Sequence, residues 1–368
     1  MGRYVERLND YVSEAIRRLE RQTSSLPDDT RQHADATKML EYLRSAKLGH
    51  PISYHKYIQK GREDNANEFV FCSREEAKDI VRRGPPRMPI ITPSRPMTRA
   101  DCQHWRQGQS TIKEHMSTRK WVDVYDSSKA DLRRVPEKMS GEEALRRFES
   151  AGEYPINALN NPVPQGMAEN HWMADVVGYY MARRLIEQAK EEGLDLSGFL
   201  DSLRVLLMAS EGAITLRHVD KNAETTCIKS RMGAKIWEIS SDRSEKEVER
   251  FGEDGTCSIA TFVILVDEGY ELIQPPMTIH SVYTYSRSML LCHQYLDSRT
   301  MVSILKQTLL ELRCGSITND DHHKDLPQLL DRAMKAWWKD AEMERPGLWP
   351  DAECLVLAEE IHKANYSA

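Results

Sequence analysis

The sequence has no closely spaced pair of cysteines. Its seven cysteines are scattered over 368 residues, from Cys72 to Cys354, and no two of them form a CxxC motif. Zinc fingers, including those that read chromatin, and thiol–disulfide oxidoreductases depend on such pairs. The sequence therefore predicts neither class. An odd number of scattered thiols is typical of a reducing compartment.

Long apolar runs are absent as well. No stretch approaches the roughly 20 apolar residues that span a bilayer. Charged residues are spread through residues 1–22, which excludes the apolar core of a secretory signal. Glu6 stands where a myristoylation motif has serine or threonine. We expect an intracellular protein, nuclear or cytoplasmic, with no membrane association.

The chain also lacks an excess of positive charge. Its net charge is −6 and its pI is about 6.1, so it offers no global attraction to nucleic acid. A hydrophobic fraction of 40% with 29% charged residues is ordinary for a globular protein. The length indicates one main domain with helical additions.

The spacing of apolar residues divides the chain into three parts. Residues 1–62 show helical spacing and predict a polar helical extension, a candidate contact between copies of the chain. Residues 63–300 contain inserted helices and then many short β-like runs broken by turns, such as AKIWEIS and ATFVILV, which favours a sandwich or barrel. Residues 301–368 return to helical spacing. The sequence thus predicts an α+β protein with a mainly β core and flanking α-helices.

The segment ITLRHVDKN carries a candidate pair of metal ligands. His218 and Asp220 are two residues apart, so they project the same way from an extended backbone. Non-haem iron(II) oxygenases use two imidazoles and one carboxylate. His280 is the best candidate for the third ligand, because it follows the turn PPMT and precedes β-branched and aromatic residues. Taken alone, an HxD pair is more often a surface histidine beside a solvated aspartate.

Four segments together resemble the JmjC family of iron(II)- and 2-oxoglutarate-dependent oxygenases, and small fungal JmjC-domain proteins most of all. They are SEGAITLRHVDKN, GAKIWEIS, YELIQPPMTIHSVYT and SMLLCHQYLDSRTM, within a resemblance that runs from about residue 65 to Thr300. The resemblance implies a double-stranded β-helix, which is a cupin-like jelly roll. It also implies Fe(II) held by the catalytic residues His218, Asp220 and His280, with 2-oxoglutarate and O2 as co-substrates.

The resemblance assigns three more residues to the co-substrate. Lys235 matches the lysine that binds the distal carboxylate of 2-oxoglutarate, by a charge-assisted bond in a dry pocket; the alternative is a lysine that extends to solvent. Thr215 matches a threonine whose hydroxyl binds the same carboxylate, although a regular strand would turn it away from His218. Asn157 matches an asparagine near the co-substrate, and a turn asparagine is the alternative.

The implied reaction is oxidative decarboxylation of 2-oxoglutarate to succinate and CO2, coupled to oxidation of a substrate carbon. The substrate would be a protein side chain, such as a methyl-lysine of a histone, or a small molecule. Ile228 stands where relatives often have a tyrosine, and Cys292 replaces a glycine, which weighs against demethylation. His293, beside that cysteine, is expected to support the site or to pack in the core.

Two other functions fit the same residues. One is a catalytically silent JmjC scaffold that acts through its helical regions as a regulatory or interaction protein. The other is a cupin that binds zinc or manganese for isomerase or lyase chemistry, because the same ligands accept other divalent ions. In that protein Lys235 would have no 2-oxoglutarate to bind.

Overall fold

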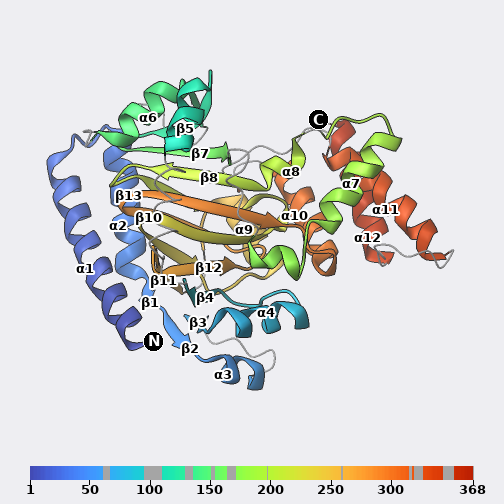
Figure 1. Cartoon of the computed structure of the whole chain (residues 1–368), viewed down its shortest axis with the longest axis horizontal. Helices are drawn as coiled ribbons and strands as arrows, with labels where there is room; N and C mark the ends of the chain where they lie inside the picture. The colour runs from blue at the N-terminus through green and yellow to red at the C-terminus, as the bar shows by residue number, and fades with distance from the viewer. Residues whose placement is uncertain are drawn as a thin grey trace.

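The computed structural model shows an α+β protein built on one large mixed β-sheet (Figure 1). It describes residues 1–60, 67–94, 110–128, 136–150, 154–163, 171–196, 198–257, 260–314, 317–318, 326–342 and 352–367. The predicted boundary between residues 62 and 63 lies outside these ranges. The predicted fold class is confirmed at the level of an α+β chain with a large sheet.

Within the described residues, thirteen strands join the sheet, in the order β2-β3-β4-β12-β10-β13-β8-β7-β5-β6, with β1, β9 and β11 off this path. The strands are β1 Lys47–Leu48, β2 His50–Ile52, β3 Glu68–Phe71, β4 Ile90–Pro93, β5 Val122–Asp126, β6 Glu137–Met139, β7 Ile156–Pro162, β8 Arg204–Ala209, β9 Ile214–His218, β10 Thr225–Ser240, β11 Thr261–Asp267, β12 Tyr270–Gln274 and β13 His280–Tyr295. Most pairs are antiparallel, and the parallel ones lie among β1, β2, β3, β4 and β11.

The antiparallel pair β10 and β13 forms the centre of the sheet, and each strand changes neighbours along its length. The first part of β10 pairs with β12, and its last part pairs with β11. The first part of β13 pairs with β9, and its last part pairs with β8. Register shifts between Ser230 and Lys235 mark the place where the pair is irregular. Such bulges bend a strand and increase its twist.

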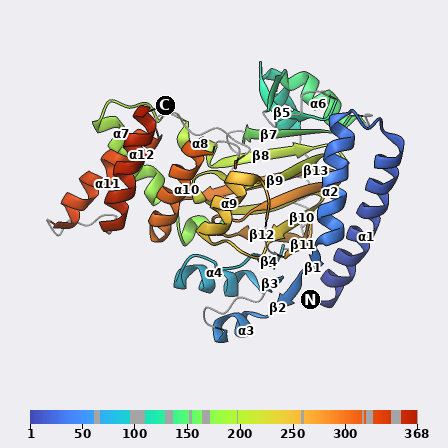
Figure 2. The ribbon, with the colours of Figure 1, turned by 180° about the vertical axis from the view of Figure 1, so that it is seen from behind.

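Helices flank the sheet at both ends (Figures 1 and 2). They are α1 Gly2–Ser25, α2 Arg31–Ser45, α3 Tyr54–Gln59, α4 Arg74–Arg83, α6 Gly141–Glu149, α7 Tyr180–Glu191, α8 Phe199–Ser202, α9 Glu245–Asp254, α10 Met301–Arg313, α11 Leu326–Glu342 and α12 Ala352–Ser367, with the 3-10 turns η1 Trp172–Asp175, η2 Lys221–Ala223 and η3 Ser298–Thr300. Helices α1 and α2 lie at one end, and α7, α11 and α12 lie at the other. Among the described helices, none has the length and apolarity needed to cross a membrane.

The N-terminal helices pack their apolar faces onto the sheet. Tyr4, Leu8 and Leu19 of α1 are fully buried in one cluster with strand residues such as Phe262. The same part of the chain also contributes strands, because β1 pairs with β11 and β2 pairs with β3. The segment predicted as a helical extension is therefore not helical throughout. Strands of two and three residues are too short to show a period of two.

The C-terminal helices form a second apolar cluster at the opposite end. It joins α7 through α12 and includes the buried Trp337 and Leu305. Val219 and Ala223, which lie on either side of the candidate ligand Asp220, belong to this cluster as well. The C-terminal helices thus touch the loop that carries the carboxylate.

Candidate metal centre

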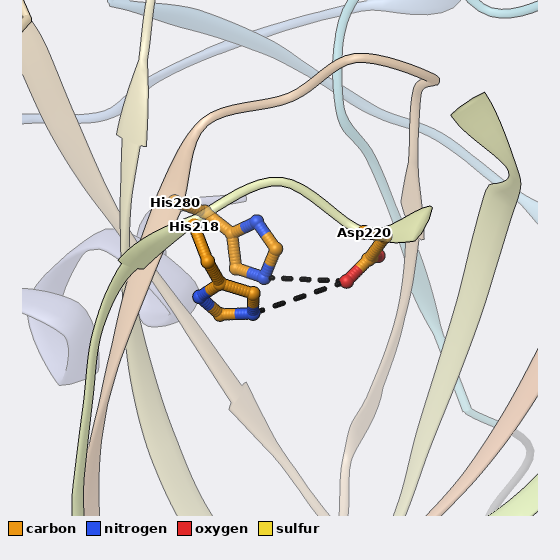
Figure 3. A group of neighbouring side chains, drawn as sticks. All are labelled: His218, Asp220 and His280. Carbon is orange, nitrogen blue, oxygen red and sulfur yellow. Dashed lines mark ion pairs between the residues drawn. The ribbon is translucent and has the colours of Figure 1, made fainter. Parts of the chain in front are cut away.

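His218, Asp220 and His280 converge on one point (Figure 3). One ligand atom from each lies within 4.8 Å of the other two, and no other group of three metal-ligating side chains does so among the residues described. Asp220 Oδ1 is 4.0 Å from His218 Nε2 and 3.8 Å from His280 Nε2. Both histidines are buried. The arrangement can hold a metal ion.

Strand pairing brings the histidines together. His218 ends β9 and His280 begins β13, and the two residues are direct partners across the antiparallel pair. Their ring centroids are 4.2 Å apart. Asp220 follows two residues later, where the chain leaves the strand and enters η2. Two ligands from neighbouring strands and one from the loop can therefore occupy one face of an ion.

Hydrogen bonds to the backbone fix the tautomer of each imidazole. His218 Nδ1 lies 2.9 Å from the Leu216 carbonyl, and His280 Nδ1 lies 3.0 Å from the Thr278 carbonyl. Because a carbonyl only accepts, each Nδ1 is the nitrogen that donates, and in a neutral imidazole Nε2 is then the nitrogen with the lone pair. Metal-binding histidines are oriented by such bonds.

The Asp220 carboxylate has one oxygen already occupied. Its Oδ2 accepts hydrogen bonds from Thr226 Oγ1 at 2.5 Å and from Gln274 Nε2 at 2.8 Å. Its Oδ1 faces the two imidazoles. Three acceptor atoms therefore meet at one place, an arrangement that a cation stabilises. Two neutral imidazoles and a carboxylate suit Fe(II), Zn(II) or Mn(II), so the donor set fits the predicted metal.

A pocket that is partly open to solvent adjoins these ligands. Lys235 lines it and is only 2% exposed. Burial lowers the pKa of Lys235 to about 8. No carboxylate among the described residues pairs with its ammonium group. A buried cation without a counter-charge is costly, so this part of the pocket suits an anion.

Asn157 and Thr215 lie in the same pocket and touch each other. Asn157 Nδ2 donates to Thr215 Oγ1 at 2.8 Å, while the buried Asn157 Oδ1 has no partner in the described part of the chain. A bulge provides the bend that Thr215 needs, because β9 advances three residues from Thr215 to His218 while β13 advances two. The extra residue turns Thr215 onto the pocket side.

The residues that differ from the JmjC pattern also lie in the pocket. Ile228 and Cys292 both line it, and burial raises the pKa of the Cys292 thiol to about 12. His293 follows Cys292 and points to the opposite face of β13, where Tyr179 Oη lies 3.3 Å from its Nδ1. It packs near His171 and is not among the described residues that line the pocket.

The sequence did not single out Thr226 or Gln274. Thr226 is one of two adjacent threonines in a β-like run, and Gln274 lies in the segment YELIQPPMTIHSVYT but was given no role there. Thr226 precedes Ile228 by two residues, so strand alternation would have placed both on the pocket side. Gln274 reaches Asp220 through a fold contact that no local pattern reveals.

No protein-family model matches this chain, and a search of curated proteins gives no match.

Proposed function

We propose that this protein is an iron(II)- and 2-oxoglutarate-dependent oxygenase of the JmjC type. The observation that carries the proposal is the presence in one pocket of two histidines, a carboxylate and an unpaired buried lysine. The ligands alone suit several metals, but Lys235 adds a site for an anion beside the metal. A dicarboxylate that chelates the metal and reaches Lys235 meets both requirements.

The sheet supports a double-stranded β-helix as the fold. In that fold, long strands contribute to two facing layers, and the metal lies between the layers. β10 and β13 pair with different neighbours at their two ends, and the pocket side chains come from β7, β8, β9, β10 and β13. This topology is consistent with the jelly roll that the motifs imply.

Each pocket residue has a defined task under this proposal. His218, Asp220 and His280 would hold iron, and Lys235 with Thr215 would bind the distal carboxylate of 2-oxoglutarate. When bound, iron and 2-oxoglutarate supply the oxidising chemistry, in which O2 is consumed, succinate and CO2 form, and a substrate C–H bond is oxidised. The buried Trp237 and Ile228 give the pocket an apolar wall beside these groups.

The substrate class follows from the same chemistry. A protein side chain, with a methyl-lysine as one candidate, or a small molecule with an accessible C–H bond would fit. Hydroxylation and N-demethylation begin with oxidation of a carbon, so the ligand set serves both. Ile228 and Cys292 shape the pocket where relatives have tyrosine and glycine, and we expect them to influence which substrate enters.

An anaerobic titration tests the proposal. Fe(II) and then 2-oxoglutarate are added to the folded protein, and the weak visible charge-transfer band of the chelated metal is recorded. We expect a band with the wild type, none with Lys235→Met, and an unchanged band with the control Lys246→Met, which alters an exposed lysine on α9. We also expect His218→Ala and Asp220→Ala to abolish succinate formation.

The alternatives predict different results. A protein that binds zinc or manganese but shows no 2-oxoglutarate band would be a cupin with other metal chemistry. A folded protein that binds no divalent ion would point to a scaffold. Succinate formation that persists at the wild-type rate in Asp220→Ala would refute the ligand assignment.

A further inference from the structure

Helix α10 lies outside the strands that carry the candidate ligands, yet it contacts the loop that holds Asp220. We name residues 219–224 the Asp220 loop. Gln307 of α10 is fully buried, and its Nε2 donates to the Asp220 carbonyl at 2.5 Å.

The same amide nitrogen of Gln307 also donates to Glu311 Oε1, one helical turn later, at 2.5 Å. Glu311 Oε1 in turn accepts from the Asn222 backbone N–H at 3.1 Å. Two side chains of one helix therefore bind the loop on both sides of Lys221.

The loop has an unusual backbone conformation at these contacts. Asn222 has φ of 55° and Ala223 has φ of 47°, both in the left-handed region. Asparagine tolerates this region, whereas an alanine there is disfavoured by its Cβ atom. Strained residues of this kind persist only where their surroundings hold them, and they concentrate at functional sites. The contacts from α10 are among the interactions that hold the loop.

A backbone contact from the segment after α10 adds to the same support. The Val219 N–H donates to the Ile317 carbonyl at 2.8 Å. Val219 and Ala223 pack in the apolar cluster of the C-terminal helices. The loop is thus fixed at its start, at its carboxylate residue and at its end by residues beyond position 300.

We propose that Gln307 and Glu311 are positioning residues for the metal centre, and that α10 sets the place of the Asp220 carboxylate. The inference rests on the proposed function, because it concerns the same metal ligands. Thr226 and Gln274 orient the carboxylate group from the sheet side, while α10 fixes the backbone from which it extends. The C-terminal helical region is then part of the site and is more than an appended arm.

Binding of Co(II) alone, without 2-oxoglutarate or O2, tests this inference. Its visible absorption reports both affinity and ligand geometry. Gln307→Leu removes the amide donor at similar size, and we expect it to weaken Co(II) binding by about 10- to 100-fold, the range typical of residues that orient ligands. We also expect an altered visible spectrum. Thr308→Val is the matched control, because Thr308 is equally buried on α10 and its hydroxyl bonds only to the Ile304 carbonyl of the same helix.

A second pair of variants makes the test independent of Gln307. Glu311→Gln keeps a side-chain oxygen that can accept from Asn222, so its affinity should remain close to that of the wild type. Glu311→Leu removes that oxygen and should bind Co(II) more weakly. If Gln307→Leu does not fold, the difference between the two Glu311 variants decides the matter.

Three results would overturn the inference, and they differ in what else they affect. Wild-type affinity and spectrum in folded Gln307→Leu, or equal affinities of Glu311→Gln and Glu311→Leu, would mean that α10 does not position the ligand, while the oxygenase proposal stands. A wild-type protein that binds no Co(II) would refute the metal site itself and this inference with it.

Discussion

Lys235 shows how one residue can favour ligand binding at the expense of stability. In the unfolded chain its pKa is near 10.5, and burial lowers the folded value to about 8. Below about pH 8 both states are protonated, and the folded state must hold a buried charge that no carboxylate in the described part of the chain offsets. The difference between the two pKa values corresponds to a cost of about 3 kcal/mol. An anion bound in the pocket would remove much of that cost.

This cost predicts an unusual variant. When neither metal nor 2-oxoglutarate is present, Lys235→Met should be more stable than the wild type. We expect its free energy of unfolding to be higher by up to about 3 kcal/mol at neutral pH, and its unfolding temperature to be higher as well. The difference should shrink as the pH rises from about 8 to about 10.5, because over this range the folded wild-type chain has lost the proton while the unfolded chain still binds it. Thermal unfolding across this range checks the result. A variant less stable than the wild type at neutral pH would show that Lys235 is already paired.

The residues of the site differ in how far the sequence revealed them. His218, Asp220 and His280 could be predicted, because HxD on a strand and a histidine after a turn are local patterns. The position of Thr215 could not, since a bulge between β9 and β13 decides it. Gln274 and Gln307 reach Asp220 from 54 and 87 residues away. Contacts between distant residues depend on the fold, and no short motif encodes them.

At the scale of elements, an ion pair between a half-buried arginine and a buried glutamate fixes β9 beside the metal centre. Arg217, next to His218, donates to Glu238 of β10 at 2.6 Å, and Glu238 also accepts from Ser281 of β13 at 2.8 Å. The Arg217 guanidinium lies 3.9 Å from the ring centroid of Tyr42 on α2. One carboxylate thus connects three strands, and its arginine partner contacts an N-terminal helix.

Removing that carboxylate should destabilise the whole arrangement. We expect Glu238→Gln to lower the free energy of unfolding by up to about 3 kcal/mol, because the half-buried Arg217 would lose its counter-charge. The double variant Arg217→Met with Glu238→Met should recover part of the loss, since neither charge then remains. Chemical denaturation measures both effects. Equal stability of Glu238→Gln and the wild type would show that water already screens the pair.

Element prediction succeeded where apolar residues recur over a long enough stretch. The helices α1 and α2 and the strands of AKIWEIS and ATFVILV were all marked by periodicity. Periodicity did not mark β1 and β2. Each has only two or three residues, and they become strands because they pair with β11 and β3. The order of strands in the sheet could not be predicted from spacing, as it depends on which distant runs pair.

For the whole molecule, two helical regions pack against the sheet at opposite ends. The apolar residues of α1 and α2 join the sheet cluster, and α10 joins the loop that carries Asp220. The predicted contact between copies through the helical regions stays a prediction. It would have to use the polar outer faces of α1 and α2, since their apolar faces are covered within the chain.

This packing predicts that the N-terminal helices and the metal centre unfold together. Leu8 of α1 is fully buried, and Leu8→Ala should cost about 2 to 5 kcal/mol, as truncation of buried leucines generally does. If the sheet is one cooperative unit, a divalent ion should raise the unfolding midpoint of this variant as much as that of the wild type, because ligand binding stabilises the unit that must form to bind it. Asn9→Ala, at the exposed neighbouring position, is the control. Calorimetry that resolves two transitions, with the metal shifting only one and Leu8→Ala only the other, would show that the helices fold apart from the site.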